Sequence, residues 1–163
     1  MLRSRMLLLL LVRFTACAAY PSRVVVNEIM SENAQAGGGI VDRNGGSADW
    51  FELYNPEDRL VNVGRLWILD ESGEAWRIPP LTMIGPRGHL LIFADDTRTA
   101  GTELHSPLDL GETGTLFVFG RDDELLDEAP WPPLRANHSW SRMPDGSDDW
   151  AEDDTPTPLA ANE

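Results

Sequence analysis

The chain has 163 residues, the length of a single domain, and is strongly acidic, with a formal net charge of −14 at pH 7. All 13 of its basic residues are arginine. Binding to nucleic acid or to an anionic membrane depends on clustered basic side chains that neutralise phosphates, so the composition argues against both as direct partners.

The N-terminal segment, residues 1–19, has the layout of a secretory signal. MLRSRMLLLLLVRFTACAA combines a basic start, a leucine-rich run too short to span a bilayer, and small residues around the cleavage region. Cys17, the only cysteine, leaves two alternatives open. Cleavage after Ala18 or Ala19 discards it, whereas lipidation would retain it as an anchor, because FTAC resembles the lipobox of bacterial lipoproteins. Without the first 17 residues, which hold three arginines and no acid, the net charge is −17.

Short strand-forming runs separated by turn residues make up the rest of the chain. Twelve prolines and 14 glycines interrupt it at short intervals, and helical periodicity is absent after the N-terminal segment. Eight strands are expected near Val24–Met30, Trp50–Asn55, Arg65–Asp70, Ala75–Ile78, His89–Ala94, Thr115–Gly120, Leu125–Ala129 and His138–Met143. FVFGRDDELLDEA predicts a hairpin with Arg121-Asp122-Asp123 at its tip. This pattern predicts an all-β sandwich or barrel.

We expect one folded domain over residues 20–145, followed by an acidic tail, residues 146–163, that is largely irregular but partly packed through Trp150. Trp50, Trp67 and Trp76 lie in strand-like runs and are expected in the core, because burying each ring removes about 150–250 Å² from water. The other three tryptophans flank Pro-rich or polar segments. An exposed subset can stack on sugar rings only if the rings project from one face of the domain.

Several fragments then occur in a recognisable order. They are VVVNEIM, VDRNGGSADWFELYNP, RLWILDES, WRIPPLTMIGPRGHLLIFADD, LHSPLDLGETGTLFVF, HSWSRMPDG and TPTPLAAN. Together, from Val24 to Asn162, they resemble a lamin tail domain of the kind found in secreted bacterial proteins. The resemblance implies an immunoglobulin-like β-sandwich and a non-catalytic module. In nuclear lamins this domain docks proteins and DNA, but the acidic charge argues against a DNA role here.

Two acids, Glu28 and Glu52, stand inside strongly β-forming runs. A carboxylate in such a position needs hydrogen bonds or an ion pair, since burying it alone would cost several kcal/mol. Both match acids that recur in lamin tail domains, and Arg142 matches the family's arginine. We expect a structural ion pair in which Glu28 and Glu52 bind Arg142 and backbone amides, joining neighbouring strands.

The loop VDRNGGSADWFEL carries oxygen ligands at Asp42, Asn44, Asp49 and Glu52. Calcium binds six to eight oxygens, which such loops supply from side chains and carbonyls. Related bacterial sequences often read D-x-D-G-D here, and Gly46 replaces the last acid. The alternatives are a weak calcium site at these four residues, or an acidic loop whose glycines serve a turn.

Motifs of hydrolytic enzymes are absent, including G-x-S-x-G, H-E-x-x-H and a phosphate-binding loop. His89, His105 and His138 fall in separate segments without metal-ligand spacing. We therefore expect no enzyme and no cofactor beyond the weak calcium alternative. The expected function is that of a monomeric, exported binding or tethering module at the cell surface or envelope, with a protein or an envelope polysaccharide as partner. Two alternatives are a small surface hydrolase that uses acidic residues and a structural envelope component without a specific ligand.

Overall fold

The computed structural model describes residues 19–95 and 103–163, which form short β-strands joined by turns and loops. Residues 1–18 of the expected signal segment, with Cys17, lie outside the described residues. The strands are β1 (Val25–Met30), β2 (Asp49–Tyr54), β3 (Val61–Asn62), β4 (Trp67–Leu69), β5 (Ala75–Arg77), β6 (Met83–Ile84), β7 (His89–Ala94), β8 (Leu104–Ser106), β9 (Gly114–Phe119), β10 (Leu125–Trp131), β11 (Ser139–Arg142) and β12 (Trp150–Asp153). Across the described ranges there is no helix long and apolar enough to cross a membrane.

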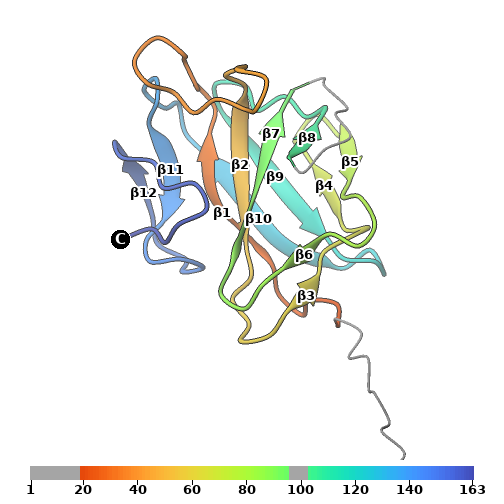
Figure 1. Cartoon of the computed structure of the whole chain (residues 1–163). Helices are drawn as coiled ribbons and strands as arrows, with labels where there is room; N and C mark the ends of the chain where they lie inside the picture. The colour runs from red at the N-terminus through yellow and green to blue at the C-terminus, as the bar shows by residue number, and fades with distance from the viewer. Residues whose placement is uncertain (1–18, 96–102) are drawn as a thin grey trace, which may run out of the picture.

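The strands form two main sheets and a small two-stranded one (Figure 1). The larger sheet has the order β12-β11-β1-β2-β7-β8, and the second has the order β10-β9-β4-β5. β3 pairs with β6 in the third sheet. The β7–β8 pair is parallel, whereas the other strand pairs within the described residues are antiparallel.

The main core lies between the two larger sheets. Ile29 and Phe51 from the six-stranded sheet belong to the same buried cluster as Ile68 and Val118 from the four-stranded sheet, and all four are fully buried. Every second residue of these strands points inward, as the pleat of a strand requires. An all-β structure of the sandwich type is thus confirmed.

All eight expected strands are present, with their ends shifted by a few residues. The hairpin is confirmed as well: β9 and β10 pair, and the Gly120 N–H donates to the Glu124 carbonyl at 2.8 Å. Four strands were not expected, namely β3, β6, β8 and β12. The first three contain only two or three residues, too few to leave a periodic pattern in the sequence.

The segment after Asp145 corrects the expectation of an irregular tail. β12 pairs antiparallel with β11, so residues 150–153 form an edge strand of the six-stranded sheet. The rings of Trp140 and Trp150 stack with their centroids 6.2 Å apart and their planes 5° from parallel. Packing through Trp150 was expected and is confirmed. The strand was missed because acidic residues have low β-propensity, which tertiary packing here overrides.

The core expectation holds for two of the three tryptophans. Trp50 is fully buried, and Trp76 packs against the main core. Trp67 instead lies on the outer face of the four-stranded sheet, where it lines a hollow. Trp131 was not expected in the core because prolines flank it, but it is only 4% exposed and belongs to the core.

The outer face of the six-stranded sheet is also covered, which explains why all six residues of β1 are buried. At one end, Ile40 and Ala48 of the loop over residues 31–48 pack on a second buried cluster of Met30, Trp50 and Phe93. Further along, the C-terminal segment, residues 155–163, contacts the carboxylates of β1 and β2. Polar side chains on this face are therefore enclosed.

Candidate functional site

Glu28 and Glu52, here called the acidic pair, lie directly opposite each other on β1 and β2. Both are fully buried. Their neighbours in register, Ile29 and Phe51, face the core, so the acidic pair points to the opposite face of the sheet. A carboxylate in each β-forming run is thus compatible with a continuous apolar core.

The C-terminal segment covers the acidic pair and donates backbone hydrogen bonds to it. Glu28 Oε1 accepts from the Ser139 hydroxyl at 2.6 Å and from the Thr157 N–H at 3.1 Å. Glu52 Oε2 accepts from the Leu159 N–H. The other carboxylate oxygen of each residue, Glu28 Oε2 and Glu52 Oε1, is buried without a hydrogen-bond partner among the described residues.

Burial controls the protonation of the acidic pair. Desolvation raises the pKa of Glu52 to about 8, with further contributions from the charges of Glu28 and Asp145 and an opposing one from the Leu159 N–H. Desolvation likewise raises the pKa of Glu28 above its ordinary value. Two carboxylates in adjacent buried positions cannot both ionise cheaply, so at least one holds a proton near neutral pH.

Arg142 does not form the expected ion pair with Glu28 and Glu52. Its Nη2 binds Asp127 Oδ1 of β10 at 2.9 Å, and its Nε donates to the Val26 carbonyl at 2.8 Å. The guanidinium also lies 4.5 Å from the ring centroid of Trp150. Arg142 thus links the six-stranded sheet to the four-stranded sheet, while the expected backbone amides do bind the acidic pair.

The four expected calcium ligands do not converge on one point. Asp49 and Glu52 lie three positions apart in β2, so their side chains leave opposite faces of the sheet. Asp49 Oδ1 accepts from the Asn33 N–H at 2.8 Å. Asp42 Oδ1 accepts from the backbone amides of Asn44 and Gly46, each at 2.8 Å, which closes the Gly45-Gly46 turn.

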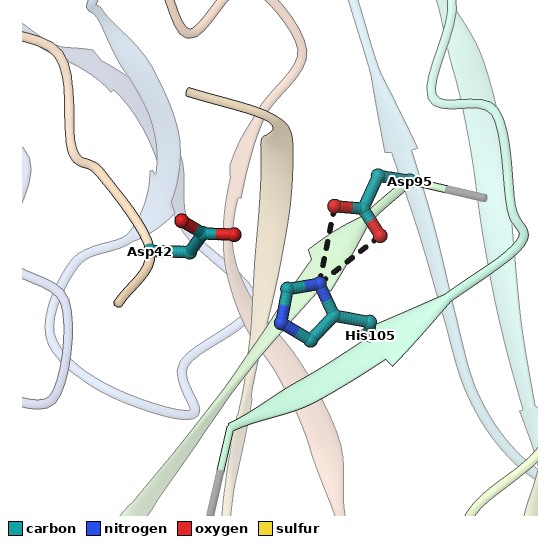
Figure 2. Close-up of side chains that lie close together, drawn as sticks. All are labelled: Asp42, Asp95 and His105. Atoms are coloured by element: carbon teal, nitrogen blue, oxygen red, sulfur yellow. Dashed lines mark hydrogen bonds and ion pairs between the residues drawn. The ribbon is translucent and has the colours of Figure 1, made fainter. Parts of the chain in front are cut away.

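Asp42 instead approaches Asp95 and His105, here called the Asp42 cluster (Figure 2). Asp95 follows β7 and His105 lies in β8, and the parallel pairing of these strands brings the two residues together. His105 Nδ1 is 3.0 Å and 3.1 Å from the two oxygens of Asp95. One ligand atom from each of the three residues lies within 4.8 Å of the others.

The donor set of the Asp42 cluster determines which cations it can hold. An imidazole nitrogen with two carboxylates suits zinc or manganese better than calcium, which binds oxygen. The same residues also form a structural cluster. His105 is paired with Asp95, the Gly46 amide lowers the pKa of Asp42 below its usual range, and the charge of His105 contributes to this lowering.

Sequence reasoning missed Asp95 altogether and expected His105 to stand alone. No local spacing could have found the cluster, because its members come from a loop and from two strands that pair only in the folded chain. The other two histidines lie elsewhere. His89 Nε2 is 2.9 Å from Asp145 Oδ2, and His138 Nδ1 is 3.6 Å from Glu152 Oε1.

The outer face of the four-stranded sheet carries apolar side chains that are only partly buried. We call it the aromatic face. Alternate residues of its strands point outward and are partly or fully exposed: Trp67, Leu69, Ala75, Phe117, Phe119 and Leu125. A hollow of about 330 Å³ lies on this face and is lined by Trp67, Leu69, Ala75, Phe119 and Asp123. Among the described residues of this lining, Asp123 is the charged one and the other four are apolar.

Comparison with protein-family models and with curated protein sequences found no match for this chain.

Proposed function

We propose that this chain is an exported, non-catalytic binding or tethering module with the immunoglobulin-like sandwich of a lamin tail domain. It acts as a monomer at the cell surface or envelope, and its ligand binds on the aromatic face. The sequence resemblance and the all-β sandwich support this proposal.

The observation that carries the proposal is the exposure of the aromatic face. Three strands place large apolar side chains outward, and no segment of the described chain covers the hollow between them. A contiguous apolar patch of this kind on a soluble protein usually marks a binding surface. Aromatic residues are also enriched where proteins meet their partners.

The placement of the acids supports a non-catalytic role. Glu28 and Glu52 are fully buried beneath the C-terminal segment, so a substrate could not reach them without displacing that segment. Glycosidase chemistry needs two carboxyl groups that flank the bond to be cleaved. The hydrolase alternative therefore has no accessible carboxylate pair at this position.

Binding of the purified chain to the envelope fraction of its source organism tests the proposal. The wild type should bind saturably, and the Trp67→Leu/Phe119→Ala double variant should lose most of that binding. The matched control is Leu81→Ala/Met83→Ala, which truncates two exposed apolar residues away from the aromatic face. Equal binding by all three proteins, or none by the wild type, would contradict the proposed function.

The location of the protein is tested separately. A mass measurement of the mature N-terminus shows whether Cys17 is retained with a lipid or removed with the signal. If it is retained, Cys17→Ser should lose membrane fractionation. Turnover of polysaccharide or phosphoester substrates that disappears in Glu52→Gln would instead support the hydrolase.

A further inference from the structure

We propose that the aromatic face binds a basic polypeptide segment, with the stem of an arginine or lysine in the hollow and its charge at Asp123. This inference rests on the proposed function and names the class of partner.

The lining of the hollow suits a long basic side chain. Trp67 and Phe119 are direct cross-strand neighbours and line the hollow together with Leu69 and Ala75. Asp123 lies at the exposed tip of the β9–β10 hairpin and is the charged residue among those that line the hollow. Arginine and lysine combine an apolar stem with a charged end. The stem would contact the apolar lining residues, and the charged end would lie near Asp123.

Trp67 already has a guanidinium beside its ring. The Cζ atom of Arg77 lies 5.2 Å from the Trp67 ring centroid, within the range of a cation–π interaction. Arg77 is the cross-strand neighbour of Trp67, so the chain itself uses this indole for a cation, and the charge of Arg77 partly offsets that of Asp123. A partner's cation in the hollow would lie near Asp123, the one charged residue in the lining among the residues that the structure describes.

The surrounding charges favour a basic partner over other occupants. Glu71 and Glu74 are exposed in the turn between β4 and β5, and Glu128 is exposed opposite Phe117. These three carboxylates outnumber the positive charge of Arg77 on the same face. The chain as a whole has a formal net charge of −14 at pH 7. A second copy or a polyanion would be repelled, whereas a basic segment would be attracted over a distance of about 10 Å at moderate salt. A neutral polysaccharide could stack on the aromatic rings but would gain nothing from these carboxylates.

A labelled short peptide in which arginine, glycine and leucine repeat is a direct probe, measured by fluorescence anisotropy at low and high salt. The wild type should bind it, and raised salt should weaken the binding. Trp67→Leu and Asp123→Asn should each lower the affinity by about tenfold. The control Asp148→Asn removes the same charge from a side chain that is 97% exposed next to the other sheet, and it should change the affinity much less.

Two further ligands complete the test. The same peptide with glutamate in place of arginine should not bind. Neutral oligosaccharides that bind the wild type and are lost in Trp67→Leu would overturn the inference in favour of a carbohydrate. Equal losses in Asp123→Asn and Asp148→Asn would also overturn it, because the attraction would then be non-specific. If the peptide fails but envelope binding still depends on the aromatic face, only this inference is wrong, and the proposed function stands.

Discussion

Replacing Glu52 by glutamine should remove much of the pH dependence of this protein's stability. In the folded chain the pKa of Glu52 is raised to about 8 from its ordinary value of 4.5, chiefly because the carboxyl is buried. The groups facing the acidic pair are Asp145, His89 and Asp153, together with the N–H groups of the C-terminal segment. All of these groups remain in the variant.

The sign follows from the protons bound in each state. Between pH 4.5 and about 8 the folded chain keeps the Glu52 proton, whereas the unfolded chain has lost it. The free energy of unfolding therefore falls as pH rises through this window. The contribution of Glu52 is fully present below pH 4.5 and lost above about 8. Each pKa unit corresponds to about 1.4 kcal/mol, so the full effect is on the order of 5 kcal/mol.

Glutamine keeps an oxygen that can accept from the Leu159 N–H but does not titrate. Urea denaturation followed by tryptophan fluorescence, at about pH 5 and about pH 9, gives the free energy of unfolding for both proteins. Between these two pH values the free energy of unfolding of the wild type should fall by several kcal/mol more than that of Glu52→Gln. At about pH 9 the wild type should be the less stable protein. Asp148→Asn, with its exposed side chain, is the control and should behave as the wild type. Parallel pH profiles for the wild type and Glu52→Gln would refute the reasoning.

Three further outcomes follow from the contacts. Arg142→Ala should lower the free energy of unfolding by about 3–5 kcal/mol, because it leaves Asp127 largely buried without its ion-pair partner. Adding Asp127→Asn to this variant should restore part of the loss. If denaturation of the two single variants and the double variant gives additive losses, the pairing is contradicted. Deleting residues 155–163 should lower the melting temperature and make the free energy of unfolding less dependent on pH, because the acidic pair is then exposed to water. An unchanged pH dependence in urea denaturation would show that the segment does not bury the acidic pair. Millimolar calcium should shift the melting temperature of the wild type and of Asp42→Ala equally, since Asp49 and Glu52 leave opposite faces of β2 and the four expected ligands do not converge. A larger shift in the wild type would restore the calcium site.

Much of the fold could be predicted from the sequence. The β-forming runs around Val24, Trp50 and Thr115, bounded by glycine, proline and aspartate, identified strands because strand propensity and turn chemistry are local properties. The same local reasoning found the β9–β10 hairpin and required partners for Glu28 and Glu52. Local reasoning missed β8, which is too short to show a pattern, and β12, which is too acidic. Both strands form because a neighbouring strand pairs with them.

The partners of the polar side chains were decided by the tertiary structure. Charge alone allowed Arg142 to bind Glu28, Glu52 or Asp127, and only the packing of one sheet on the other selected Asp127. In the same way, Asp42 meets His105 because the β7–β8 pairing brings distant segments together, while Glu52, on the same face of the sheet, is bound by the Leu159 N–H of the C-terminal segment. Strand formation depends on neighbours in sequence, whereas the site depends on register and on which segment covers which face, and these are fixed only when the whole chain packs.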